Sequence, residues 1–210
     1  MIQILIADDH PIVREGLRRL LAEEADMRVL GEAETSQAAL SLVEHGNWDV
    51  VVLDLAMPGR GGIEVLKEIR RLRPKLPVLI LSVSPEDQFA IRALKAGAAG
   101  YVTKMTAPSE LVTAIRKAVS GGRYVSSNLA ERLAMQASPE ARAAAHDALS
   151  DREYQVMQLL AAGKTITEIA RELSLSVKTI STHRTRILQK LHLRTTGDII
   201  RYAVAHDLAP

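Results

Sequence analysis

The chain has 210 residues, of which 47% are hydrophobic and 25% charged, so it can form one large domain or two small ones with buried cores. Because there is no cysteine, disulfide bonds, iron–sulfur clusters and thiolate zinc sites are excluded. The net charge is only +2, and no apolar run approaches the roughly 20 residues of a membrane span. Two acids come early in the sequence and no basic leader precedes them, so we expect no signal peptide. We therefore expect a cytoplasmic protein with no membrane partner.

Short apolar runs alternate with amphipathic stretches in the first part of the chain. The runs predict strands at Ile2–Ala7, Met27–Ala33, Val50–Leu53, Val78–Leu81 and Gly100–Thr103. The stretches between them predict helices at Pro11–Glu24, Ser36–His45, Ile63–Arg73, Pro85–Ala96 and Pro108–Ser120. Five strands alternating with five helices indicate an α/β domain with a doubly wound parallel sheet, the flavodoxin-like (βα)5 fold.

The alternation stops near Gly121, and the rest of the chain is helical. We expect a short helix at Ser127–Gln136 and a linker at Ala137–Asp147, where alanine is frequent. Four further helices are predicted at Asp151–Ala161, Thr165–Leu173, Val177–Leu191 and Thr196–His206. The expected organisation is an α/β domain at 1–122, a linker with a short helix at 123–147, and an all-α four-helix domain at 148–210.

Three acids follow predicted strands that are neighbours in this fold. Asp8 and Asp9 follow the first strand, and Asp54 follows the third. Parallel strands place their carboxyl ends at one edge, so these carboxylates should converge, which is costly unless a cation lies among them. Oxygen ligands favour Mg²⁺, with Mn²⁺ as the alternative. The sequence therefore predicts a divalent cation site.

Two more polar groups end strands at the same edge. Ser82 ends the fourth strand and Lys104 the fifth. With these groups the site suits phosphoryl transfer: Asp54 would be the nucleophile, Lys104 would neutralise phosphoryl oxygens, and Ser82 would hydrogen-bond the product. Taken singly, each residue has a plainer explanation, since the acids could cap helices and Lys104 could be solvated. The joint placement of all five favours the site.

The motifs Asp8-Asp9, Asp54-Leu-Ala-Met-Pro-Gly-Arg-Gly-Gly, Leu81-Ser82 and Gly100-Tyr-Val-Thr-Lys104 resemble the receiver domain of response regulators over roughly residues 1–122. The resemblance implies that Asp54 is the phosphoacceptor. It also implies that Asp9 binds Mg²⁺ directly, Asp8 binds it through water, and the Ala56 carbonyl is a further ligand. Ser82 and Tyr101 would form the coupled switch pair, in which the aromatic ring turns inward on phosphorylation.

A basic stretch in the helical part suits a polyanion. Between Ser176 and Arg194 there are five basic residues and no acid, whereas acids and bases balance before Val125. The residues from Glu168 to Leu191 read as helix, turn, helix, and the second helix can enter the DNA major groove. Its long cations are Lys178, Arg184, Arg186 and Lys190, with no acid nearby to neutralise them, and we expect those that face DNA to contact phosphates. The alternative is a solvated amphipathic helix, which the helix-turn-helix context disfavours.

The segments Leu149-Ser-Asp-Arg-Glu, Ala162-Gly-Lys-Thr and Ser176-Val-Lys-Thr-Ile-Ser-Thr-His-Arg-Thr-Arg resemble the LuxR-type DNA-binding domain over roughly residues 149–208. A receiver followed by this domain is typical of the NarL/FixJ family. The resemblance implies that Ser181, Thr182 and Thr185 face the groove, where family members often carry lysine. Thr179, at the start of the same helix, is a further candidate DNA contact.

Together these features predict a transcription regulator, not an enzyme. Its expected partners are a sensor histidine kinase that phosphorylates Asp54, double-stranded promoter DNA, a second copy of the chain and, as a further candidate, RNA polymerase. The last helix could pair two DNA-binding domains. Three alternatives stay open: an aspartyl-phosphate phosphatase, a DNA-binding protein independent of phosphorylation, and a phosphorelay protein without DNA binding.

Overall fold

The computed structural model describes residues 1–57, 60–83, 88–105, 108–136, 145–206 and 208. The chain divides into two compact units, Met1–Leu133 and Ala134–Pro210. The first unit includes most of the short helix that the sequence places after the α/β domain.

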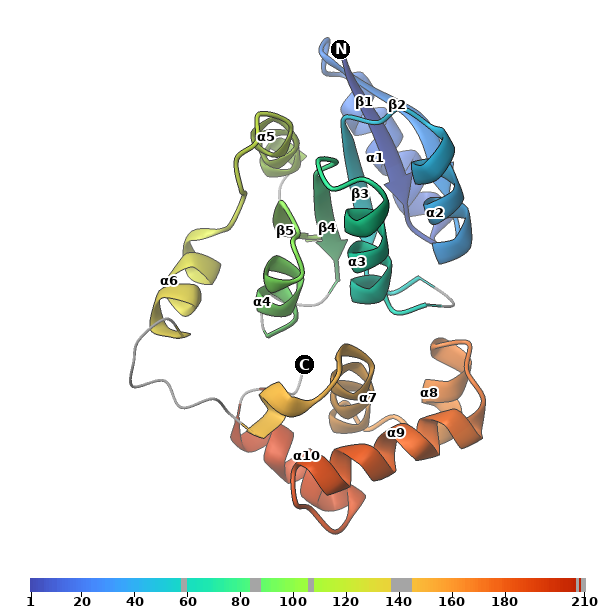
Figure 1. Cartoon of the computed structure of the whole chain (residues 1–210), viewed down its shortest axis with the longest axis vertical. Helices are drawn as coiled ribbons and strands as arrows, with labels where there is room; N and C mark the ends of the chain where they lie inside the picture. Colours follow the sequence, from blue (N-terminus) through green and yellow to red (C-terminus); the bar gives the residue numbers. More distant parts are fainter. Residues whose placement is uncertain (58–59, 84–87, 106–107, 137–144, 207, 209–210) are drawn as a thin grey trace. The chain divides into compact units, whose positions relative to one another are not determined.

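The first unit is built around a parallel sheet of five strands (Figure 1). The strands are β1 (Ile2–Ala7), β2 (Met27–Ala33), β3 (Val50–Asp54), β4 (Val78–Ser82) and β5 (Gly100–Thr103). Their order is β2-β1-β3-β4-β5, and every neighbouring pair is parallel. This is the doubly wound order expected from the sequence, with its switch point between β1 and β3.

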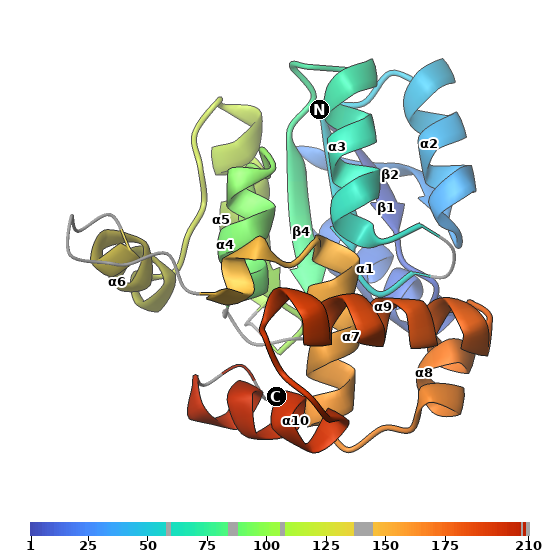
Figure 2. The ribbon, with the colours of Figure 1, turned by 60° about the horizontal axis from the view of Figure 1, so that its bottom comes forward.

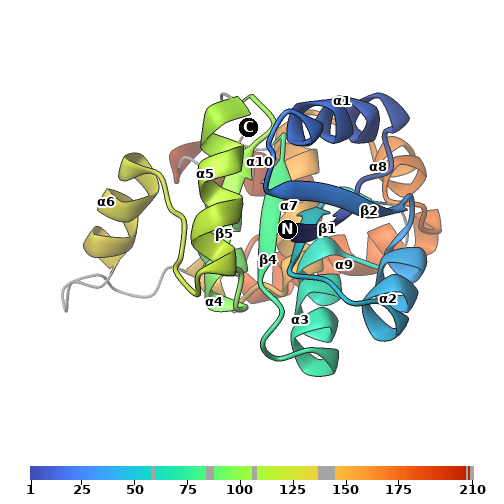
Figure 3. The same ribbon diagram turned by 90° about the horizontal axis from the view of Figure 1, so that it is seen from above.

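Helices cover both faces of the sheet. They are α1 (Pro11–Ala22), α2 (Ser36–His45), α3 (Gly62–Leu72), α4 (Gln88–Lys95) and α5 (Pro108–Val119). Seen from above, α1 and α5 lie on one face, and α2, α3 and α4 lie on the other (Figure 3). β3 and β4 are buried along their whole length because both of their faces are covered. The predicted start of the fourth helix at Pro85 lies outside the described residues.

The edge strand β2 differs from the central ones because exposed residues alternate with residues that are buried or half-buried. Near it, the indole of Trp48 donates a hydrogen bond from Nε1 to the Leu42 carbonyl at 2.7 Å. A Cβ atom added at Gly31 or Gly46 would come within about 2.5 Å of this ring. Trp48 is therefore packed tightly at the end of the sheet where the strands begin.

The segment after α5 returns to the sheet before the chain leaves it. Tyr124 forms a parallel bridge with Gly100 at the start of β5, and its hydroxyl donates to Glu110 at 3.0 Å. Helix α6 (Ser127–Gln136) follows, as the sequence predicts. Most of the predicted linker lies outside the described residues; its end is a short 3₁₀ helix, η1, at Ala145–Ala148.

The second unit is helical, as expected. It contains α7 (Asp151–Ala161), α8 (Ile166–Glu172), α9 (Val177–Lys190) and α10 (Thr196–Ala205), with α9 lying across α7 and starting beside α8 (Figure 2). Capping boxes begin three of these helices, at Ser150, Thr165 and Thr195. Ser176 caps α9, which follows a tight turn where Ser174 has a φ of 52°. Within the described residues, no helix is long and apolar enough to cross a membrane.

Candidate functional site

The three predicted carboxylates meet where β1 and β3 end. Asp8 and Asp54 are both 1% exposed, and Asp9 is partly exposed. Ligand atoms of Asp8, Asp9, Asp54 and His10 all lie within 4.8 Å of one another. The structure thus brings together the acids that the sequence singled out.

Lys104 lies between two of these acids. Its Nζ atom is 2.6 Å from Asp8 Oδ2 and 2.8 Å from Asp54 Oδ2. Burial alone would lower the pKa of Lys104, but hydrogen bonds to Asp54 and Asp8 outweigh it, so the pKa lies above its usual value. The ammonium group therefore stays charged against the two buried carboxylates.

Asp54 itself is held from two sides. One carboxylate oxygen accepts the hydrogen bond from Lys104, and the other accepts the backbone N–H of Ala56 at 3.0 Å. Burial raises the pKa of Asp54, and Lys104 and the Ala56 N–H reverse only part of that shift. A buried carboxylate with fixed orientation and a neighbouring cation is the arrangement expected of a positioned nucleophile.

The two predicted switch residues lie on strands β4 and β5. Ser82 ends β4, next to β3, and is 3% exposed. Tyr101 in β5 is completely buried, so its ring lies inside the unit. Neighbouring residues of a strand point to opposite faces, which places Tyr101 on the opposite face of the sheet from Val102, a residue of the core cluster that α5 also lines.

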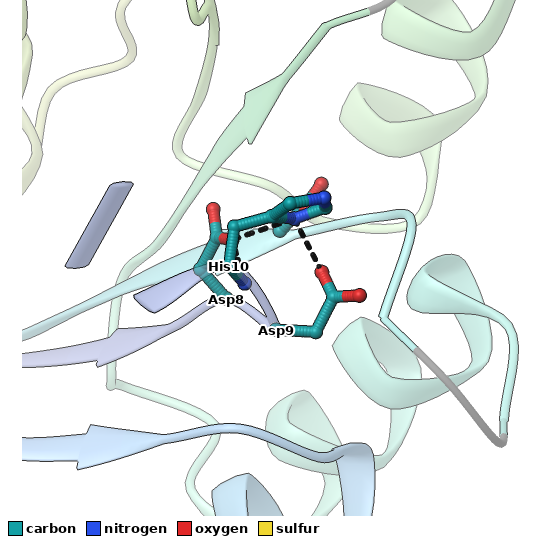
Figure 4. Close-up of side chains that lie close together, drawn as sticks. Asp8, Asp9 and His10 are labelled. Atoms are coloured by element: carbon teal, nitrogen blue, oxygen red, sulfur yellow. Dashed lines mark hydrogen bonds and ion pairs between the residues drawn. The ribbon is translucent and has the colours of Figure 1, made fainter. Parts of the chain in front are cut away.

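His10 belongs to the site although the sequence reasoning did not select it. Its Nδ1 atom is 2.8 Å from Asp9 Oδ1 and 3.4 Å from Asp8 Oδ1 (Figure 4). It is the residue before α1 and makes no side-chain cap to that helix. Its place directly after the two acids was the available signal.

The donor set fits a hard divalent cation. Three carboxylates lie together, and Lys104 pairs with two of them, so negative charge remains in excess. Carboxylate oxygens are the ligands that Mg²⁺ and Mn²⁺ prefer. The predicted cation site is therefore compatible with the side chains that surround it.

Helix α9 presents the predicted nucleic-acid contacts. Lys178, Thr182, Thr185 and Arg186 are exposed, whereas Thr179, Ser181 and Arg184 are half-buried. The hydroxyl of Thr182 donates to the Lys178 carbonyl and that of Thr185 to the Ser181 carbonyl, both at 3.0 Å. With the hydroxyl protons used inside the helix, these oxygens are left to accept hydrogen bonds from outside.

The prediction that no acid lies near the long cations of the basic helix is wrong for Lys190. Lys190 does have an acidic neighbour: its Nζ lies 2.7 Å from Glu153 Oε2 and 3.1 Å from the Ala148 carbonyl. Glu153 is 37 residues away in the sequence, so the basic stretch alone does not predict this ion pair. Lys190 therefore pairs within the helical unit, and its contact with DNA phosphates stays a prediction.

Two protein-family models match the chain. One, described as the response regulator receiver domain, matches residues 4–116. The other, described as bacterial regulatory proteins of the luxR family, matches residues 147–203.

One known protein and two solved structures illustrate the similarity. The response regulator UvrY of Escherichia coli strain K12 is 37% identical over 209 residues, which cover 99% of this chain and 96% of UvrY. RcsB from Salmonella enterica serovar Typhimurium, bound to promoter rprA in the presence of phosphomimetic BeF3⁻, is 31% identical with a TM-score of 0.64; the match covers 96% of this chain and 97% of RcsB. A structure of two RcsB dimers bound to two parallel DNAs is 30% identical with a TM-score of 0.60, covering 97% and 98% of the two chains.

Proposed function

Because this chain belongs to the NarL/FixJ family of two-component response regulators, we propose that a sensor histidine kinase phosphorylates it on Asp54, and that phosphorylation promotes dimerisation and binding to specific promoter DNA. The family match makes it a transcription regulator with a receiver and a LuxR-type DNA-binding domain, not an enzyme. We place the receiver at 1–122, the linker at 123–147 and the DNA-binding domain at 148–210.

One observation carries the proposal for Asp54. Its buried carboxylate is oriented by the Ala56 N–H and shares the Lys104 ammonium with Asp8. An Asp54 oxygen would attack the phosphorus atom, and the bond from phosphorus to the donor's histidine nitrogen would break, the electron pair leaving with that nitrogen. Lys104 would stabilise the charge that develops on the phosphoryl oxygens.

Asp9 and Asp54 would hold Mg²⁺ or Mn²⁺ directly, together with the Ala56 carbonyl, and Asp8 would hold it through water. When bound, the cation supplies positive charge to the phosphoryl oxygens. Ser82, which ends the strand beside β3, would donate its hydroxyl to the phosphoryl group on Asp54. Tyr101, whose ring is buried in this structure, would be the second member of the switch pair and would respond to the movement of the Ser82 hydroxyl.

DNA binding would follow from helix α9. Lys178 and Arg186 would contact phosphates, and Ser181, Thr182 and Thr185 would approach base edges. Thr179 and Arg184, which are half-buried, are proposed as further DNA contacts. The RcsB structures support the arrangement, since that protein binds DNA as dimers. A dimer presents two reading helices at high effective concentration, so dimerisation and affinity for specific DNA should rise together.

Phosphorylation by acetyl phosphate with Mg²⁺, followed by mass spectrometry of the intact chain, tests the assignment of Asp54. The wild-type chain should gain one phosphoryl group, and Asp54→Asn should gain none, because the amide lacks a nucleophilic oxygen. Asp49→Asn is a matched control, since Asp49 lies just before β3 and is exposed. Incorporation at the wild-type rate in Asp54→Asn would show that another residue is the acceptor.

Sedimentation of the phosphorylated chain tests dimerisation. A phosphorylated chain that binds DNA tightly as a monomer would contradict the proposed dimerisation.

A further inference from the structure

Arg14 is a buried cation whose contacts reach the acidic site. Its side chain is 7% exposed, and its guanidinium donates to three groups: the Asp8 carbonyl at 2.7 Å, Glu32 Oε2 at 3.2 Å and Glu34 Oε1 at 2.5 Å. We propose that Arg14 is a positioning residue that orients the Asp8–Asp9 turn for binding of the divalent cation. The inference rests on the proposed function, because it concerns the same cation site.

The backbone of Asp8 is fixed on both sides. Its N–H donates to the Ala33 carbonyl at 3.0 Å, and its carbonyl accepts from Arg14. Its side chain accepts the N–H of His10 through Oδ1 at 2.9 Å, which leaves Oδ2 facing Lys104. Asp8 is only 1% exposed, so loss of Arg14 would leave its carbonyl without the donor that now satisfies it, at a cost that favours rotation of the turn.

The geometry of arginine explains why this residue type is present. Arg14 lies in the first turns of α1, and helical side chains lean toward the helix N-terminus, which directs this one at the turn after β1. Its planar fork donates to three groups on two segments at once, the turn after β1 and the end of β2, whereas lysine has a single nitrogen. Glu32 and Glu34 are 37% and 71% exposed, so their ion pairs add little stability by themselves and mainly hold the guanidinium plane.

Loss of Arg14 should change the Mg²⁺ affinity in opposite directions, according to whether the charge of Arg14 or its positioning of Asp8 matters more. A fixed cation near a divalent cation repels it, so removal of the charge alone should strengthen Mg²⁺ binding. Loss of a positioned carboxylate should weaken binding, because groups that orient metal ligands typically contribute 10- to 100-fold to affinity. A residue with only a general structural role would lower the unfolding temperature and leave the affinity of the folded protein unchanged.

Titration calorimetry with MgCl₂ on the intact, unphosphorylated chain separates these cases. Arg14→Met should raise the Mg²⁺ dissociation constant about tenfold. Arg14→Lys keeps the charge and loses the fork, so it should also bind Mg²⁺ more weakly than wild type. Arg116→Met is the matched control, because Arg116 pairs with Asp26 and Glu24, which lie just before the start of β2, whereas the acidic site lies where β1 and β3 end. Its affinity for Mg²⁺ should equal that of wild type.

Phosphorylation by acetyl phosphate supplies a second measurement. The Mg²⁺ concentration needed for half the maximal rate should rise in Arg14→Met, and the rate at saturating Mg²⁺ should return close to wild type. Unchanged or tighter Mg²⁺ binding in Arg14→Met would overturn the proposal. If that variant does not fold, Arg14→Lys decides the question, and wild-type affinity there would overturn it. A wild-type chain that binds no Mg²⁺ would instead overturn the proposed cation site, and the role of Arg14 with it.

Discussion

Lys190 at the end of α9 forms an ion pair with Glu153 near the start of α7, with 2.7 Å between Nζ and Oε2. The Glu153 side chain is 3% exposed and also accepts the backbone N–H of Ser150 at 2.8 Å. Lys190 thus binds, from another helix, the same Glu153 carboxylate that takes part in the capping box of α7. The contact ties the C-terminal end of α9 to the start of α7.

Lys190→Met should destabilise the second unit by about 1–2 kcal/mol, because it leaves a buried carboxylate with one charged partner fewer. The loss should be smaller than for a fully buried pair, since the Lys190 side chain is 38% exposed and solvent screens part of the interaction. Hydrogen exchange of peptides from α7 and α9 measures the loss. Lys178→Met, which removes an exposed cation from the same helix, is the control and should change little. Equal protection in both variants would refute a structural role for Lys190.

The same pair predicts an acid-sensitive contribution to stability. Burial would raise the pKa of Glu153, but the hydrogen bonds from Lys190 and Ser150 hold it below its usual value. Ionised Glu153 therefore stabilises the fold fully above the pKa of an unfolded glutamate, about 4.3, and this contribution is lost as the pH falls through the lower folded pKa. The stability difference between wild type and Glu153→Gln should be largest at neutral pH and should shrink in acid. A pH-independent difference would contradict the ion pair.

Arg186→Ala should weaken binding to specific and scrambled DNA alike, because phosphate contacts carry no sequence information. The slope of log affinity against log salt should fall by about one unit. Lys190→Met should leave this slope nearly unchanged, since Lys190 is paired with Glu153. Titrations at several salt concentrations compare the two variants. An equal loss of slope in both would show that Lys190 contacts a phosphate in spite of its ion pair with Glu153.

Substitutions of Thr182 should separate its hydroxyl from its methyl group. Thr182→Ala should cost about 1–3 kcal/mol on the preferred site if the residue contacts a base, with little effect on scrambled DNA. The hydroxyl proton is already donated to the Lys178 carbonyl, so the side chain offers a base only an acceptor oxygen and a methyl group, and we expect contact through the methyl group. Thr182→Val should then retain most of the specific affinity and Thr182→Ser should lose it. The reverse order would indicate a hydrogen bond to the base, and equal losses on both duplexes would exclude base reading by this residue.

The architecture follows from local patterns that the sequence displays. Strands covered on both faces, such as β3 and β4, are continuous apolar runs, and their ends identify Asp54 and Ser82 directly. The alternation of strands and helices then brings Asp8 close to Asp54, so the acidic cluster was predictable from topology.

Residues that act through long-range contacts were not predictable in this way. Arg14 looks like one more cation on an amphipathic helix, and its burial depends on how α1 packs beside the end of β2. Lys190 looks like part of a basic stretch until α7 places Glu153 beside it. The helical period shows which face a residue occupies, but it does not show which distant side chain meets that face.

The packing of Trp48 against Gly31 and Gly46 also gives the receiver its own optical probe. This residue is the only tryptophan in the chain, and it lies in the first compact unit. Its fluorescence emission should change when the receiver unfolds and should stay constant when the DNA-binding unit unfolds. Circular dichroism follows both units together. Comparison of the two signals on one intact sample would therefore resolve the two transitions, which a single melting curve of a two-unit chain combines.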